Sequence, residues 1–244
     1  MMDGHEAHSR AGLEQPVVAI AVGGGLDAQL EGLGYLHHGR SRGREALSWH
    51  SIADYVQDLS ATLARIGRPA VVVGHSMGAF VLQKYLETRP VAAAVLLAPV
   101  PPQGLGAPSV ELALREPALF SEVNAIMQVG RASPQALQRA MFAQPIEAAR
   151  LDAFHARCQR ESQRAIWDMA MFNPVQVWRV ARVPLLYLAA ELDRLIPLHY
   201  HAAGAALLGH PLEVAQGFGH GVMLESGWKR LADRVIGWLR EKLS

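Results

Sequence analysis

One serine in this sequence lies where a polar side chain is unexpected. Residues 71–86, VVVGHSMGAFVLQKYL, run from a β-branched apolar stretch into a helix-like one, with Ser76 in a G-x-S-x-G turn between them. Glycine allows the backbones that flank so tight a turn to approach closely. Ser76 could simply cap the helix. The strand before Gly74 and the helix after Gly78 instead favour an exposed nucleophile, placed where helix N–H groups face a developing anion.

A serine hydroxyl needs a histidine base and a carboxylate that orients the base. Of the 11 histidines, His220 is best placed, in the glycine-flanked loop GFGHGVMLE before the last helix; the alternative is a loop-capping histidine. Asp193 directly follows the apolar segment LLYLAA, which places it at the carboxyl end of a strand, where Ser76 also emerges. Glu191 competes for the same role. The sequence therefore predicts a site of Ser76, His220 and one of two acids.

Strands alternating with helices are predicted to position these residues. Amphipathic spacing predicts a helix over 51–67, with Ser51 as its cap and Gly67 at its end, and a last helix over 227–243. Apolar runs bounded by Gly or Pro indicate strands buried on both faces. These runs are PVVAIAVGGG (16–25), RPAVVVGHS (68–76), VAAAVLLAPVPP (91–102) and VPLLYLAAELD (183–193). The pattern predicts an α/β fold with a doubly wound, mostly parallel sheet.

One stretch breaks this alternation. Residues 103–182 contain helix patterns and no convincing strand, between PVPPQGLGAP and ARVP. We predict a core of 1–102 and 183–244, with 103–182 as a helical cap over the carboxyl edge of the sheet. The larger apolar side chains of this cap are interpreted first as helix core, with some available to line an apolar pocket; they are Met127, Met141, Phe142, Met169, Met171 and Phe172.

Composition excludes several classes of partner. The net charge is +1, with 23 basic and 22 acidic residues, so no basic stripe predicts binding to nucleic acid or an anionic membrane. The longest apolar run, VAAAVLLAPV, is too short to span a bilayer, and the N-terminus lacks the apolar core of a secretory signal. The single cysteine, Cys158, excludes an intrachain disulfide and is interpreted as structural. We expect a cytoplasmic protein with a small-molecule substrate and no stable membrane insertion.

Together these motifs resemble the α/β-hydrolase superfamily, in particular its lysophospholipase-like and monoacylglycerol-lipase-like serine esterases. The segments that carry the resemblance are HHGRSRG, VVVGHSMGAFVLQKYLE, VAAAVLLAPVPP, LLYLAAELDRLIP and GFGHGVMLE. The resemblance implies hydrolysis of a carboxylic ester, with Ser76 as nucleophile, Asp193 as acid and His220 as base, in the chain order expected of such a triad. It implies no organic cofactor and no metal, and the Met77 amide as one donor to the oxyanion.

The chain departs from this family near its N-terminus. The segment AIAVGGGLDAQLEGLGYLHHGRS has Gly23 where relatives usually have a histidine, and it is too short for a full helix and strand. The N-terminal part of the sheet is therefore predicted to be shortened. Gly23 or Gly24 would supply the second oxyanion donor, and the loss of one such donor costs about 10²- to 10³-fold in rate. We expect Ser76 to be reactive but turnover to be slow; the alternative is a catalytically impaired protein that binds a ligand or has a structural role.

Overall fold

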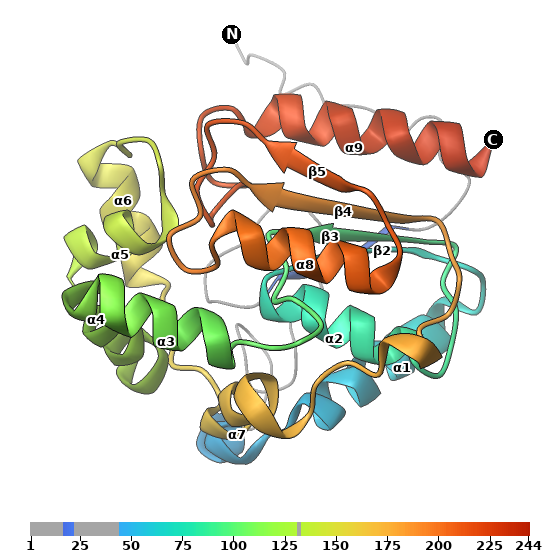
Figure 1. The fold of residues 1–244 in the computed structure, drawn as a ribbon, viewed down its shortest axis with the longest axis horizontal. Coiled ribbons are helices and arrows are strands. Elements are labelled where there is room, and N and C mark those ends of the chain that lie inside the picture. Colours follow the sequence, from blue (N-terminus) through green and yellow to red (C-terminus); the bar gives the residue numbers. More distant parts are fainter. Residues whose placement is uncertain (1–16, 22–43, 131–132) are drawn as a thin grey trace, which may run out of the picture.

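Five parallel strands form one sheet in the order β1-β2-β3-β4-β5 (Figure 1). The computed structural model describes residues 17–21, 44–130 and 133–244. The strands are β1 (Val17–Ala21), β2 (Val71–His75), β3 (Ala93–Leu97), β4 (Leu185–Ala190) and β5 (Leu212–Ala215). The predicted α/β fold class with a parallel sheet is confirmed. The predicted shortening depends on 22–43, which lie outside the described residues.

Helices cover both faces of this sheet. Successive residues of β3 point to opposite faces. Ala94 and Leu96 pack in the large core with the helices after β1 and β2, whereas Ala93 and Val95 pack against the C-terminal helix. Figure 1 shows α1, α2 and α8 on one face and α9 on the other. Their bounds are α1 (Ile52–Ile66), α2 (Met77–Leu86), α8 (Leu198–Leu208) and α9 (Trp228–Leu243).

Capping residues determine where helix α1 begins and ends. The Ser51 side chain accepts a hydrogen bond from the Asp54 amide, and the Asp54 carboxylate accepts one from the Ser51 amide at 2.8 Å. This reciprocal pair is a capping box, which satisfies two backbone donors that would otherwise be unpartnered. Gly67 ends the helix with φ of 67°, a left-handed conformation that glycine adopts without strain. The predicted helix over 51–67 is therefore confirmed.

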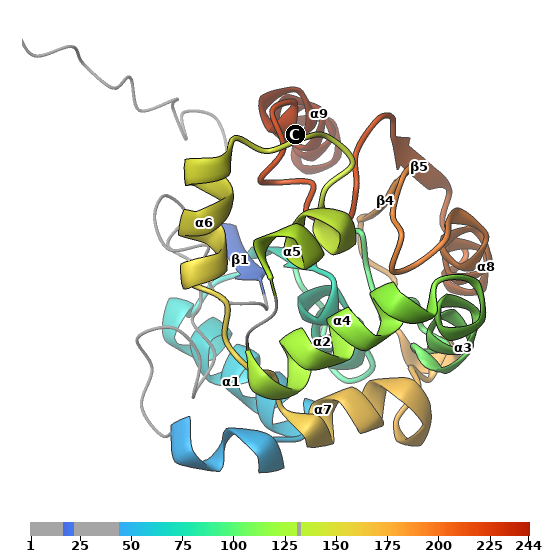
Figure 2. The same ribbon diagram turned by 90° about the vertical axis from the view of Figure 1, so that its left-hand side faces the viewer.

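Between β3 and β4 the described residues form helices and no strand. Their bounds are α3 (Gly106–Arg115), α4 (Pro117–Val129), α5 (Pro134–Met141), α6 (Ala148–Ala156), α7 (Gln163–Trp167), the π-helical turn η2 (Asp168–Phe172) and the 3-10 turn η3 (Val177–Arg179). A further 3-10 turn, η1 (Arg44–Trp49), precedes α1. Figure 2 shows α4 and α5 in front of α2. The division into core and cap stays a prediction.

One helix pattern of the sequence is interrupted in the structure. Residues 145–172 read as a single helical segment, but the chain leaves the helix after α6 and resumes it only at α7. The buried Glu161 carboxylate accepts a hydrogen bond from the Tyr55 hydroxyl of α1 at 3.0 Å, and Ser162 caps α7 through the Ala165 amide. The break therefore coincides with one contact to a distant helix and with the local cap of α7.

In the part of the chain that the structure describes, no helix combines the length and apolar character that crossing a membrane requires.

Candidate active site

Ser76 lies in a strained turn between β2 and α2. Its φ is 51° and its ψ is −119°, an uncommon conformation for a residue with a side chain. A side chain at Gly74 would place its Cβ 2.6 Å from the Ala79 Cα, so only glycine lets the strand and helix approach this closely. The turn forms here because Gly74 lets a strand of β-branched residues approach the following helix closely. The Ser76 side chain is left half-buried at the tip.

Neighbouring backbone holds the strained turn in place. The Ser76 amide donates to the Leu97 carbonyl at 3.1 Å, and the Val100 amide donates to the Ser76 carbonyl at 3.2 Å. Both partners belong to β3 or the segment just after it. Met77 is the first residue of α2, so no carbonyl within the helix can accept from its amide. Met77 directly follows Ser76 in the chain, and the role of its amide as an oxyanion donor stays a prediction.

The structure brings Ser76, His220 and Asp193 together. His220 Nε2 lies 2.9 Å from Ser76 Oγ, and His220 Nδ1 lies 2.7 Å from Asp193 Oδ2. A carboxylate can only accept, so Nδ1 donates to Asp193, and Nε2 is left to accept from the Ser76 hydroxyl. The other oxygen of Asp193 accepts from the Leu195 amide at 2.8 Å. Glu191, the competing acid, accepts instead from the Gly217 amide at 2.8 Å.

Burial and charge set the protonation of this group. Burial alone would raise the pKa of the Asp193 carboxyl, but the charges and donor groups of His220 and His201 outweigh burial and hold that pKa well below its usual range. Asp193 is therefore an anion at neutral pH. Burial lowers the pKa of His75 to about 3, and the nearby charge of His220 adds to the effect, so the His75 ring is neutral.

His75 also contacts His220 directly. The His75 Nε2–H donates to the His220 carbonyl at 2.8 Å, and the two ring centroids lie 5.0 Å apart. His75 is the last residue of β2, so this bond ties the histidine loop to the strand that presents Ser76. His220 is thereby fixed to the same scaffold as Ser76.

Backbone contacts on both sides of the histidine hold its loop against α5. The Gly219 amide and the Ala143 amide both donate to Glu225 Oε1, at 2.9 and 2.7 Å. On the other side, the Gly221 amide donates to the Met141 carbonyl at 2.6 Å. The end of α5 therefore packs beside the histidine loop. A buried carboxylate that accepts two backbone amides is worth more than a neutral acceptor in the same place.

Three of these polar residues were missed by sequence reasoning: His75, Glu225 and His201. His75 had a local signal, because it precedes the serine within the motif itself. Glu225 has none for its contact with Ala143, which is distant in the sequence, and His201 has none because its approach to Asp193 depends on how α8 packs against β4. Gly23 and Gly24, the predicted second oxyanion donors, lie outside the described residues.

Two of the predicted core side chains of the helical stretch are not core. Met169 is 4% exposed and Phe142 is 6% exposed, but Met171 and Phe172 are 62% and 67% exposed. The π-helical turn η2 rotates Met171 and Phe172 away from the core that Met169 enters. The Cys158 thiol is half-buried between α6 and α7, and burial raises its pKa, in keeping with a structural thiol.

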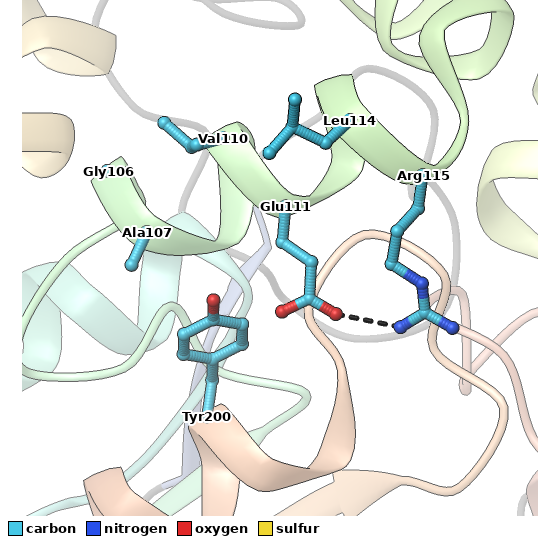
Figure 3. Close-up of a pocket in the computed structure, with 7 residues that line it drawn as sticks. All are labelled: Gly106, Ala107, Val110, Glu111, Leu114, Arg115 and Tyr200. Carbon is cyan, nitrogen blue, oxygen red and sulfur yellow. Dashed lines mark hydrogen bonds and ion pairs between the residues drawn. The ribbon is translucent and has the colours of Figure 1, made fainter.

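A separate open depression of about 450 Å³ lies between α3 and α8 (Figure 3). Val110 and Leu114 line it, and the Glu111 carboxylate lies between Arg115 and Tyr200. Arg115 donates to Glu111 at 2.7 Å, so these charges satisfy each other. Ser76, Asp193 and His220 do not line this depression. Within the described residues, no group of three or more His, Cys, Asp or Glu side chains could hold a metal ion.

The chain belongs to the alpha/beta hydrolase family, whose model matches residues 29–234. This match includes Ser76, Asp193 and His220, and it confirms the resemblance inferred from the sequence motifs. The chain is therefore an enzyme of the α/β-hydrolase type. No curated protein matches its sequence significantly.

Solved structures of esterases share the fold across nearly the whole chain. An esterase from Exiguobacterium antarcticum is 16% identical with a TM-score of 0.69, over 94% of this chain and 93% of that one. Polyneuridine aldehyde esterase is 19% identical with a TM-score of 0.67, over 91% and 100%. A monoacylglycerol lipase from Paleococcus ferrophilus is 16% identical with a TM-score of 0.66, over 93% and 96%. At such identities the likeness is one of fold.

Proposed function

We propose that this protein hydrolyses carboxylic esters through an acyl-enzyme formed on Ser76. The observation that carries the proposal is the unbroken chain of contacts from Ser76 Oγ to His220 at 2.9 Å and from His220 to Asp193 at 2.7 Å. Membership of the α/β-hydrolase family supports it, as does the likeness in fold to esterases and a monoacylglycerol lipase.

The first half of the reaction makes the acyl-enzyme. Ser76 Oγ attacks the ester carbonyl carbon while its proton passes to His220 Nε2, and the carbonyl oxygen becomes an anion. Asp193 accepts from Nδ1–H and stabilises the imidazolium that forms. As the tetrahedral intermediate collapses, the bond to the alkoxy group breaks and the alcohol leaves with the proton from His220.

The second half releases the acid. Water gives a proton to His220 Nε2 and attacks the acyl carbon, and Ser76 leaves with that proton as the intermediate collapses. The Met77 amide is the donor that we assign to both oxyanions. We also assign this role to Gly23 or Gly24, and the rate of turnover depends on that second donor.

The substrate class is a small ester with an acyl or lipid-like group. The apolar residues of the helical stretch, which we propose as a cap, suit an apolar acyl chain better than a charged one. This chemistry requires no metal and no organic cofactor, because the nucleophile, base and acid are all side chains.

The test uses purified protein and p-nitrophenyl esters of increasing chain length. We expect a burst of nitrophenol equal to the enzyme concentration, because acylation releases the alcohol before water releases the acid. A fluorophosphonate should label the wild type and Ser60→Ala, a matched surface serine, but not Ser76→Ala. Labelling that persists in Ser76→Ala would refute the assignment of the nucleophile.

The same experiment distinguishes the two functions weighed from the sequence. Labelling of Ser76 followed by repeated turnover supports the hydrolase. Labelling with a single slow burst and no turnover over hours would instead support the impaired, ligand-binding protein.

A further inference from the structure

A second histidine lies against the acid of the proposed triad. His201, on α8, is fully buried, and its Nε2 lies 3.8 Å from Asp193 Oδ2, the same oxygen that accepts from His220. This separation is longer than a hydrogen bond, so the contact is an electrostatic one. His201 Nε2 has no other partner. Burial of a polar nitrogen without a hydrogen bond costs free energy, so the position of His201 Nε2 beside Asp193 needs an explanation.

The Nε2 atom of His201 must carry a proton. Asp193 is an anion, and a nitrogen lone pair aimed at its oxygen would repel it, whereas an N–H attracts it. This holds whether the ring is neutral or doubly protonated, because both forms can carry the proton on Nε2. Two imidazoles therefore share one carboxylate oxygen, His220 as a close donor and His201 as a more distant one.

Tyr187 holds the other side of the His201 ring. Its hydroxyl lies 3.4 Å from His201 Nδ1, and burial raises the pKa of Tyr187 well above its usual range, so the hydroxyl keeps its proton. In the neutral form of His201, this hydroxyl donates to Nδ1 and so keeps the ring proton on Nε2. A side chain at Gly204 would place its Cβ 2.7 Å from the Tyr187 hydroxyl, so a glycine on α8 makes room for it.

We propose that His201, oriented by Tyr187, is a positioning residue that sets the basicity of His220 through Asp193. The proposal rests on the proposed hydrolase function, in which His220 is the base. An N–H near Asp193 Oδ2 withdraws negative charge from that oxygen and weakens its attraction for the His220 imidazolium. The titratable groups that face His201 are Tyr187 from β4 and Asp193 from the loop after β4, with His220 beyond Asp193.

The central experiment compares the pH profiles of wild type and His201→Leu. Leucine removes the N–H and leaves the full carboxylate charge to His220, which raises the pKa of the base. The acid limb of kcat/KM should move up by roughly 0.5–1 pH unit, so that kcat/KM falls by about three- to tenfold at pH values below the limb and changes little on the plateau. The titration of His220 followed by NMR should move by the same amount. The NMR measurement needs no turnover, so failure of the hydrolase function would not obscure it.

Three further variants separate positioning from mere structure. His201→Gln offers an amide N–H and should keep the His220 titration near that of wild type. Tyr187→Phe removes only the hydroxyl that orients His201 and should move the titration in the same direction as leucine, by less. His199→Leu, an exposed histidine on the same helix, should change nothing. If folded His201→Leu or, should that variant not fold, Tyr187→Phe titrates like wild type, the proposal is wrong.

Discussion

The turn at Ser76 is surrounded by hydrogen bonds and buried side chains, whereas the helices between β3 and β4 expose many apolar side chains. At the turn, the Ser76 amide and carbonyl are both bonded to neighbouring backbone, and the side chains around it are buried. Between β3 and β4, by contrast, the helices hold more than half of the large apolar side chains that are exposed in the described residues. Several contacts therefore hold the first region in place, whereas the outer surface of the second exposes apolar side chains.

This difference shows where the proposed chemistry is fixed and where it can vary. Strained backbone persists only where its surroundings hold it, and the sheet supplies that support at Ser76. The helical stretch contacts the loop of His220 chiefly at the end of α5, where Met141 and Ala143 bond to it, with further bonds from Gln144 and Arg150. Substitutions that touch none of these contacts should therefore leave the geometry of the three site residues unchanged.

The largest effect should come from the three site residues themselves. Ser76→Ala and His220→Ala should each lower kcat for ester hydrolysis by about 10⁵- to 10⁶-fold, and the double variant should be no worse, because residues that act as one unit are not additive. Steady-state and burst kinetics on one nitrophenyl ester would measure this. Losses that multiply in the double variant would contradict a shared mechanism.

Gly74→Ala should be the most damaging change in the turn outside those residues. The new Cβ would lie 2.6 Å from Ala79 Cα, so β2 and α2 must separate. We expect a loss of about 1–3 kcal/mol in the free energy of unfolding and a fall of about 10²-fold in kcat from displacement of Ser76. Gly237→Ala, on α9 with open space around it, is the matched control and should be neutral or stabilising. A fully active Gly74→Ala would show that the position of Ser76 does not depend on the close approach of β2 and α2.

Glu225→Ala tests the contact between the two regions at the end of α5. It leaves the buried amide of Gly219 without its acceptor, at about 1–3 kcal/mol, and removes the acceptor of the partly exposed Ala143 amide, at a smaller cost. Chemical denaturation should show this loss, and hydrogen exchange should increase at both amides. Glu225→Gln keeps an acceptor oxygen and should retain most of the stability. Slow exchange at Ala143 in the alanine variant would mean that other contacts hold α5 in place.

The same comparison explains how far the sequence could predict the structure. The helix over 51–67 and the strand before Ser76 follow from capping residues and apolar runs, which act within a few residues of each other. The proposed triad was predictable because Ser76, Asp193 and His220 each stand in a turn or loop with its own local pattern. The break at 157–162 was missed although Ser162 is a local capping residue, and the buried bond between Glu161 and Tyr55 at this break could not be predicted from the sequence. His201 was missed because its site exists only once α8 packs against β4.

His75 should make stability depend on pH. Its folded pKa, about 3, lies below the unfolded value of about 6.5. The unfolded chain therefore binds the extra proton first, so this contribution to stability is complete above pH 6.5 and is lost as pH falls toward 3. The slope from this residue is at most about 1.4 kcal/mol per pH unit. His75→Gln should flatten the slope of unfolding free energy between pH 6.5 and 4, as measured by urea titration.

The control for His75 is His210, whose pKa burial also lowers. His210 is only partly buried and lies away from the site. His210→Gln should therefore flatten the slope in the same direction but by less. An unchanged slope in His75→Gln would mean that folding does not lower the pKa of His75.

The smallest effect should come from the outer surface of the helical stretch. Met169 and Met171 lie two residues apart in η2, but Met169 is 4% exposed and Met171 is 62% exposed. Met171→Ala removes side-chain atoms that are largely in water and should change the free energy of unfolding by less than about 0.5 kcal/mol. Met169→Ala opens a cavity in the large core and should cost about 2–5 kcal/mol. Urea titration of both variants gives the two values under one condition.

Neither variant should alter kcat by more than its loss of folded protein, because η2 contributes no bond to the loop of His220. A large cost at Met171, equal to that at Met169, would show that this surface is covered in solution and that the contrast between the two regions is smaller than the structure indicates.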